Sequence, residues 1–222
     1  MSKKQIQLDI ISDVMCPWCI VGYKQLLPAL DQFKDEVDFV VNWQPFELNP
    51  NMPEKGQELR EHLHEKYGST DEESKQNRKR LEDIGKDLDF TFKFTDESKI
   101  VNSFSAHQLL TYAFEQGQKT NNKQLQTNVK LSLFKAHFSD ARDVSDINVL
   151  IEVALENGLA KSEVSRILNN QTYAQNVRES QQKWMQNGIN AVPAVVVNMK
   201  YLLSGAQPTQ SYIDVINNVL KA

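Results

Sequence analysis

The hydrophobic pattern at the start of the chain predicts a strand, a helix and a second strand. Between Ile6 and Ile10 apolar and polar residues alternate, as in a strand with one buried face. From Ile20 to Phe33 apolar residues recur at helical spacing, and Pro28 should kink that helix. Alternation returns from Val37 to Trp43. A strand–helix–strand unit of this size predicts parallel strands joined by a right-handed crossover.

The middle of the chain has a helical pattern from about Pro53 to Gly188. The segment Thr70–Glu73 is a predicted capping box at the start of a charged helix. Gly117, Gly158 and Gly188 each follow a periodic apolar segment, where a glycine that ends a helix is expected. Three apolar helix faces predict a separate small core: those of His107–Phe114, Leu125–Phe138 and Ile147–Leu155.

The C-terminal pattern returns to strands and a helix. Ala194–Asn198 is β-branched and strand-like, and Tyr201–Leu203 is expected to pair with it as a hairpin. Pro208 stands at a plausible first position of a final amphipathic helix. In the middle piece, the alternating run Phe90–Phe94 is interpreted as an extended link.

The order of these elements is that of an α/β, thioredoxin-like fold with a large inserted α-helical domain. We expect the first part of the thioredoxin-like domain in residues 1–52 and its second part in residues 189–222. Residues 53–188 would then form the inserted helical domain.

Composition and charge narrow the possible partners. The 222 residues carry a net charge of −4, which argues against binding to nucleic acid or to an anionic membrane. The basic start Met1–Lys4 is followed by alternating rather than uniformly apolar residues, which predicts a strand and not a signal peptide. We therefore expect a cytoplasmic protein, in a compartment where structural disulfides are rare.

The two cysteines of the chain form a Cys16-Pro17-Trp18-Cys19 motif. Cys16 follows a predicted strand and begins a predicted helix, where free backbone N–H groups and the helix dipole favour a thiolate. Pro17 suits the first helical turn, and Cys19 lies three residues on, within reach of a disulfide with Cys16. With no basic residue between the cysteines, we expect the pKa of Cys16 to be lowered moderately.

Other interpretations of the cysteine pair are weaker. A structural disulfide closing so short a loop would contribute only about 2 kcal/mol. A zinc site needs two more ligands, and the available histidines have no finger or ribbon spacing. These histidines are His62, His64, His107 and His137. A buried, unreactive pair is the third alternative. No metal or bound cofactor is expected.

Several segments in order along the chain resemble the DsbA-like FrnE family. They are Ile10–Gly22, Trp43–Pro50, Asn102–His107, Gly188-Ile189 with Val192-Pro193, and Ser204–Gln207. The resemblance covers essentially the whole chain and implies a thioredoxin fold with dithiol–disulfide exchange. There are two departures: Ala194-Val195 replaces the common Thr-Phe after the proline, and a further cysteine pair present in some relatives is absent.

The resemblance also implies residue roles. Cys16 would be the attacking cysteine, Cys19 the resolving cysteine and Pro193 a cis-proline facing them. We expect Pro17, Trp18 and Val192 to contact the substrate beside Pro193. Phe46 and His107 are also assigned to the substrate site, with a position in the interior of the protein as the alternative for each.

Two rival functions remain open. The 2-hydroxychromene-2-carboxylate isomerases and kappa-class glutathione transferases are similar in overall plan, but they typically have serine in place of Cys16 and activate glutathione without a resolving thiol. The other rival is a redox-regulated, chaperone-like binding module. The expected partner is a protein or small molecule with a disulfide or dithiol, possibly with glutathione as co-substrate. The protein would act as a monomer or homodimer.

Overall fold

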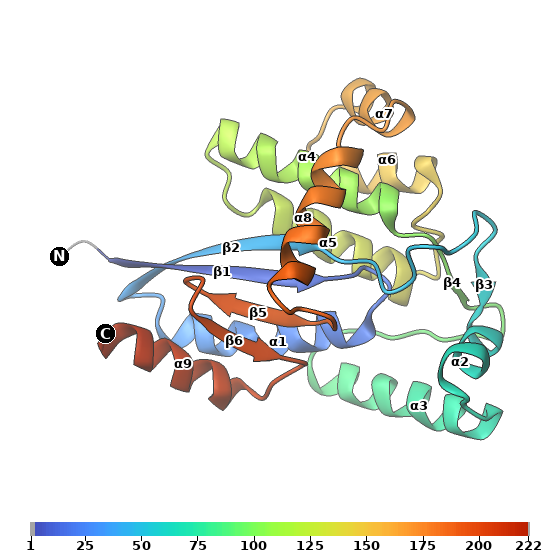
Figure 1. The fold of residues 1–222 in the computed structure, drawn as a ribbon, viewed down its shortest axis with the longest axis horizontal. Helices are drawn as coiled ribbons and strands as arrows, with labels where there is room; N and C mark the ends of the chain where they lie inside the picture. The colour runs from blue at the N-terminus through green and yellow to red at the C-terminus, as the bar shows by residue number, and fades with distance from the viewer. Residues whose placement is uncertain (1–2, 222) are drawn as a thin grey trace.

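The computed structural model describes residues 3–221 and has a mixed four-stranded sheet at its centre (Figure 1). The strand order is β2-β1-β5-β6. β1 (Lys4–Ser12) runs parallel to β2 (Val37–Pro45) and antiparallel to β5 (Ala194–Val197), which forms a hairpin with β6 (Tyr201–Ser204). The predicted parallel pair and the predicted hairpin are both confirmed.

Helices cover both faces of this sheet. α1 (Pro17–Gln32) and α9 (Thr209–Lys221) pack together on one face, over alternate residues of β1 and β5 (Figure 1). On the other face, Trp184 of α8 (Ala174–Gln186) packs against Ile11 of β1. The alternation of the strands therefore divides their side chains between two apolar layers, as the sequence pattern predicted.

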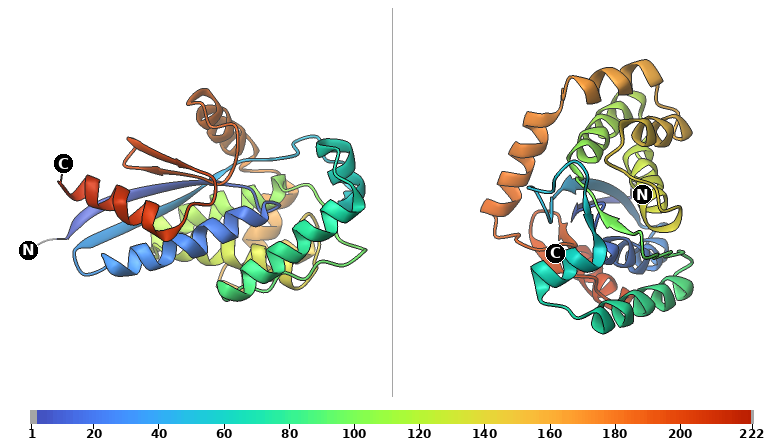
Figure 2. Two further views of the ribbon diagram at one scale, coloured as in Figure 1. Left: turned by 90° about the horizontal axis from the view of Figure 1, so that it is seen from below. Right: turned by 90° about the vertical axis from the view of Figure 1, so that its right-hand side faces the viewer.

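The chain between β2 and β5 is mainly helical; its first elements lie at one end of the sheet, and its later helices lie along the side of β2 (Figure 1 and Figure 2). They comprise β3 (Gln57–Glu58), α2 (Leu59–Tyr67), α3 (Asp71–Asp87), β4 (Lys99–Ile100), α4 (Phe104–Thr120), α5 (Leu125–Phe134), a π-helical turn η1 (Lys135–Ser139), α6 (Ile147–Glu156), α7 (Lys161–Asn169) and α8. β3 and β4 pair antiparallel, a small sheet that the sequence pattern did not predict. Within residues 3–221, no helix combines the length and apolar character needed to cross a membrane.

The ends of these helices test the predicted signals. The capping box of Thr70 and Glu73 is present at the start of α3. Gly158 and Gly188 follow helices with φ of +79° and +83°, as predicted. Gly117 was wrongly predicted to end a helix: it lies inside α4, whose left-handed cap is Asn121. A Cβ at Gly117 would lie 2.7 Å from the carbonyl oxygen of Asn122, so glycine is needed there for close approach of the next turn.

The inserted helices form a core of their own, but they also share the core of the sheet. α4, α5, α6 and α7 bury a joint apolar cluster, which confirms the predicted second core. However, Leu81 of α3 and Phe134 of α5 pack into the cluster under the sheet. Residues 90–95 form no helix or strand, and Phe92 packs against Phe138 with ring centroids 5.4 Å apart. The inserted region is therefore packed against the sheet and not only against itself.

The side chain of Gln126 joins α5 to the edge strand β2. Its Oε1 accepts a hydrogen bond from the Trp43 N–H at 2.9 Å, and its Nε2 donates to the Trp43 carbonyl at 2.9 Å. Nε2 also donates to the Leu110 carbonyl at 3.3 Å. The buried amide thus pairs with β2 as a neighbouring strand would.

Replacing Gln126 with methionine is expected to lower the free energy of unfolding by about 2–4 kcal/mol, because the backbone groups of Trp43 would stay buried without partners. Urea unfolding measures this loss. The matched control is Gln124→Met at an exposed position two residues earlier, expected to change stability by less than about 0.5 kcal/mol. Equal stability of the two variants would contradict the assignment.

Candidate active site

The Cys-Pro-Trp-Cys motif lies where β1 ends and α1 begins. Cys16 is the N-cap residue of α1, with extended backbone (φ −97°, ψ 109°), and Pro17 is the first helical residue. The Cys19 N–H donates to the Cys16 carbonyl at 3.0 Å. Both cysteines are free thiols, with exposed fractions of 4% for Cys16 and 0% for Cys19. The predicted placement at a helix N-terminus is confirmed, with Cys16 outermost.

The loop before β5 meets the thiols from the far end of the chain. The Val192–Pro193 peptide bond is cis, as predicted. Sγ of Cys16 lies 3.7 Å from the carbonyl oxygen of Val192, within reach of a weak hydrogen bond. A Cβ at Gly22 of α1 would lie 3.3 Å from Cγ of Pro193, so the proline ring packs closely on the helix that carries the cysteines.

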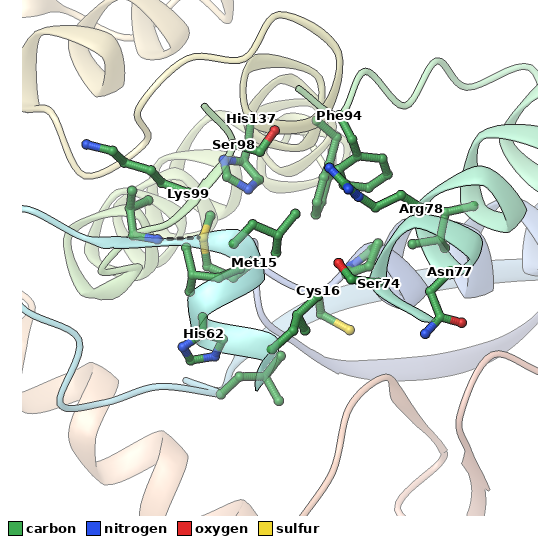
Figure 3. A pocket seen from close by; sticks show the side chains of 18 of the residues that line it. Met15, Cys16, His62, Ser74, Asn77, Arg78, Phe94, Ser98, Lys99 and His137 are labelled. Carbon is green, nitrogen blue, oxygen red and sulfur yellow. Dashed lines mark hydrogen bonds between the residues drawn. The ribbon is translucent and has the colours of Figure 1, made fainter. Parts of the chain in front are cut away.

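A cavity of about 640 Å³ opens over Cys16 (Figure 3). Pro17, Trp18 and Val192 line it beside the thiol. The other walls come from the inserted region, namely α2, α3, residues 93–101 and residues 137–143. Because Cys16 is nearly buried, this cavity is the route by which a substrate would reach its sulfur.

Two residues assigned to the site from the sequence lie elsewhere. Phe46 is half-buried and packs against the apolar cluster that contains Trp184 and Ile189. His107 is buried behind the thiols, with Nε2 3.6 Å from Oδ1 of Asp13. Neither side chain lines the cavity. The structure thus gives both residues the interior positions that were the alternative reading of the sequence.

Asp13 is a buried carboxylate that sequence reasoning did not assign to the site. Its Oδ2 accepts from the Leu48 N–H at 2.7 Å, and its Oδ1 accepts from the Met15 N–H at 3.1 Å. Burial alone would raise the pKa of Asp13, but the neighbouring His107 ring and these two amides outweigh burial and lower it. A negative charge is therefore held beneath the loop that precedes Cys16.

Lys130 of α5 is a second buried charge near the thiols. Its exposed fraction is 1%, and its Nζ lies 4.8 Å from the ring centroid of Phe134 and 5.4 Å from that of Trp43. Burial lowers the pKa of this ammonium group to about 8, although the nearby Cys19 and Asp13 act in the opposite direction. The positive charge of Lys130 therefore acts on the inner thiol, Cys19, and lowers its pKa.

The surroundings of the two thiols differ, and this corrects one prediction. The hydrogen bond with Cys19, burial and the charge of Asp13 raise the pKa of Cys16 well above its usual value. For Cys19, burial acts to raise the pKa, but the hydrogen bond from Cys16 and the charge of Lys130 lower it overall. The predicted moderate lowering for Cys16 is therefore wrong for the reduced pair at rest, because the hydrogen bond with Cys19, burial and the charges of Cys19 and Asp13 all favour the protonated thiol.

The histidines are dispersed. His62 lies against Gln57, with Nδ1 2.7 Å from Oε1, while His64 is exposed. His137 lines the cavity, and burial lowers its pKa to about 4. Across residues 3–221, no three His, Cys, Asp or Glu side chains are grouped closely enough to hold a metal ion.

Comparison with known proteins agrees with this geometry. The sequence model of the DSBA-like thioredoxin domain matches residues 7–217. The chain belongs to the DsbA-like thioredoxin family. It is a family of disulfide oxidoreductases, and the match confirms the family resemblance found in the sequence.

Several solved structures have the same fold over most of their length. A probable DsbA oxidoreductase from Streptomyces coelicolor superposes with a TM-score of 0.88 at 28% identity, covering 97% of this chain and 90% of that one. A 2-hydroxychromene-2-carboxylate isomerase gives 0.70 at 12% identity, with coverages of 97% and 96%. The cytosolic disulfide reductase DsbM from Pseudomonas aeruginosa, in a structure with GSH, gives 0.61 at 14% identity, with coverages of 97% and 100%.

Proposed function

We propose that this DsbA-like protein is a dithiol–disulfide oxidoreductase in which Cys16 is the nucleophile and Cys19 the resolving thiol. The observation that carries the proposal is the asymmetry of the pair. Cys16 lines the cavity, whereas Cys19 is fully buried behind it. Only the outer sulfur is placed to meet a substrate, and the inner sulfur is placed to attack the mixed disulfide.

The exchange follows from the reduced pair. In the reduced pair Cys19 loses its proton first, because its pKa is lowered and that of Cys16 is raised. Cys16 becomes the nucleophile when its own proton passes to the Cys19 thiolate as substrate arrives. The Cys16 thiolate attacks one sulfur of the substrate disulfide, and the other sulfur leaves as a thiolate. Cys19 gives its proton to the departing thiolate, attacks Sγ of Cys16 and releases the second half of the substrate as a thiolate. The enzyme is left with a Cys16–Cys19 disulfide, and the substrate has gained two electrons.

The glutathione-dependent isomerase or transferase remains the rival function. The similarity to the isomerase structure, at 12% identity, is a similarity of fold alone. The presence of both thiols favours exchange, because the rival chemistry needs no resolving cysteine. Since the related DsbM structure holds GSH, glutathione is the first physiological reductant to test for this cytoplasmic role.

The test is the reduction of insulin disulfides by dithiothreitol, and separately by glutathione, with and without the protein. We expect the wild-type protein to raise the rate well above that of the reductant alone. The control is a double variant, Cys16→Ser with Cys19→Ser, which removes both thiols and whose fold is checked by circular dichroism. Equal rates for the two proteins with every disulfide substrate tried would contradict the proposal and favour the glutathione-dependent rival.

A further inference from the structure

Two polar side chains of α3 reach the cavity without hydrogen-bond partners. The Oγ of Ser74 and the Nε of Arg78 are both buried and unpaired within residues 3–221. The residues are four positions apart, so they lie on the same face of the helix, and both line the cavity that contains Cys16. Figure 3 shows both side chains directed from α3 into the opening where the Cys16 sulfur lies.

The missing partners are unusual for this setting. Nearly all buried polar side-chain atoms in proteins are hydrogen-bonded, because an unpaired one has lost its water without gaining a partner. A helical serine can donate to the carbonyl four residues earlier, but Ser74, with an exposed fraction of 2%, makes no such bond. These two groups therefore present a donor pair to whatever occupies the cavity.

The position of α3 is fixed by packing. Arg80 lies over the ring of Trp18 with Cζ 5.5 Å from the centroid, which ties the helix to the active-site motif. A Cβ at Gly85 would lie 2.7 Å from Cδ2 of Phe92, so only glycine permits this close contact with the aromatic link. The helix cannot easily turn Ser74 and Arg78 toward other partners.

We propose that Ser74 and Arg78 bind the carboxylate of a small organic disulfide while Cys16 attacks its sulfur. This inference rests on the proposed function and names its substrate class. An Arg guanidinium and a hydroxyl are well suited to a carboxylate, since the Arg bond is charge-assisted and the hydroxyl adds a second donor. A cavity of about 640 Å³ has the volume of a small-molecule site, and Leu63, Phe94 and Val101 supply apolar walls for the body of the ligand.

The other charged groups that line the cavity do not compete with Arg78 for a carboxylate or neutralise it. Arg142 pairs with Glu152, and His137, with its pKa of about 4, is neutral near pH 7. Asp143 already accepts two hydrogen bonds from Ser145. Lys93 and Lys99 add positive charge to the rim, against one further carboxylate, that of Glu97. The cavity as a whole thus favours an anionic ligand.

The exchange reaction transfers one half of the ligand to Cys16. With its carboxylate on α3, the disulfide presents one sulfur to the Cys16 thiolate. A Cys16–sulfur bond forms, the disulfide bond of the ligand breaks, and the departing half leaves as a thiolate.

The test compares two chromogenic disulfides in single turnovers of the reduced protein, followed by stopped flow after the reductant is removed. Dithiobis(nitrobenzoate) carries carboxylates, and dithiodipyridine carries none. The measured quantity is the rate constant for dithiobis(nitrobenzoate) divided by that for dithiodipyridine. Arg78→Gln should lower this ratio about tenfold, because the carboxylate loses a charged hydrogen bond, and Ser74→Ala should lower it about threefold, because it loses a neutral one. Any effect of the substitution on thiol reactivity cancels in the ratio.

The matched control is Lys75→Gln, which removes a positive charge from an exposed position of the same helix outside the cavity. Its ratio should stay within about twofold of the wild-type ratio. An unchanged ratio in Arg78→Gln, or an equal fall in Lys75→Gln, would overturn the inference.

A failure of the proposed function gives a different result, in which the wild-type protein reacts with both disulfides no faster than free cysteine. The carboxylate site is then still measured by binding of the thionitrobenzoate anion to Cys16→Ser. Calorimetry should show affinity about tenfold weaker when Arg78→Gln is added. Equal affinity of the two proteins would overturn the inference independently of exchange.

Discussion

Replacing Cys16 with serine is expected to abolish disulfide exchange, lowering kcat/KM by at least about three orders of magnitude. A serine hydroxyl is barely ionised at neutral pH, so the variant has no effective nucleophile at position 16. Insulin reduction at matched protein concentration measures the loss. Because Cys16 is nearly buried, near-identical circular dichroism and unfolding curves are needed to show that the variant is folded.

Replacing Cys19 with serine should have a different outcome, which separates the two roles. Cys16 would still attack, but the mixed disulfide would persist because no thiolate lies behind it. Mass spectrometry of Cys19→Ser incubated with a disulfide substrate should show one substrate half attached to Cys16. If the adduct instead formed on Cys19 in Cys16→Ser, the roles of the two thiols would be exchanged.

The parts of the fold that the sequence predicted are those set by local pattern. Alternation identified β1 and β2, a β-branched run with a short turn identified β5 and β6, and the Cys-x-x-Cys placement identified the start of α1. Each signal depends on residues close together in sequence. Gly117 shows the limit of such signals, since the same residue serves a helix end or a close helix contact, and only the packing of Asn122 distinguishes them.

The site was predicted in part for the same reason. Cys16, Cys19 and the facing Val192-Pro193 come from short motifs, but the walls of the cavity come from polar residues of helices that resemble solvated faces in the sequence. Ser74 and Arg78 lie in such a charged helix, yet Ser74 is buried and Arg78 is half-buried. The helix is held in place by the contact of Gly85 with Phe92, a residue outside it. Tertiary burial of isolated polar residues has no periodic signature.

Lys130 is the clearest case of a residue hidden from sequence reasoning. It lies between Val129 and Leu131 in a helix buried on most sides, where a lysine would ordinarily be assigned to the exposed face. Together with Asp13, it places one buried charge of each sign near the thiol pair. The inserted helical region thus supplies the active site with a charge as well as a wall.

Replacing Lys130 with methionine is expected to stabilise the protein while slowing its chemistry. In the folded protein the pKa of Lys130 is about 8, against a usual value of 10.5. Between these values the unfolded chain binds more protons, so stability rises with pH, and below about 8 the folded state carries the full cost. That cost is about 3 kcal/mol, from which the lost contacts with the rings of Trp43 and Phe134 must be subtracted.

We therefore expect Lys130→Met to raise the free energy of unfolding near neutral pH by about 1–3 kcal/mol and to remove the rise in stability above pH 8. Urea unfolding of the oxidised protein across this range excludes the two thiols, which do not titrate there, and the difference between the wild-type and variant profiles isolates the lysine. The control is Lys135→Met, an exposed lysine paired with Asp140, which should leave the profile unchanged. If the free energy of unfolding of Lys130→Met changed with pH in parallel with that of the wild type, burial would not lower the pKa of this ammonium group.

The same substitution should slow the second half of the reaction. The charge of Lys130 lowers the pKa of Cys19, so its removal leaves less Cys19 thiolate to attack the mixed disulfide. We expect release of the second substrate half to slow about tenfold, with the first attack by Cys16 much less affected. Rapid quenching with acid followed by mass spectrometry would then detect the mixed disulfide in Lys130→Met and not in Lys135→Met. A variant that is more stable but equally fast would show that Lys130 has no part in resolution. A variant that is more stable but resolves the mixed disulfide more slowly would show that the buried charge serves exchange at the expense of stability.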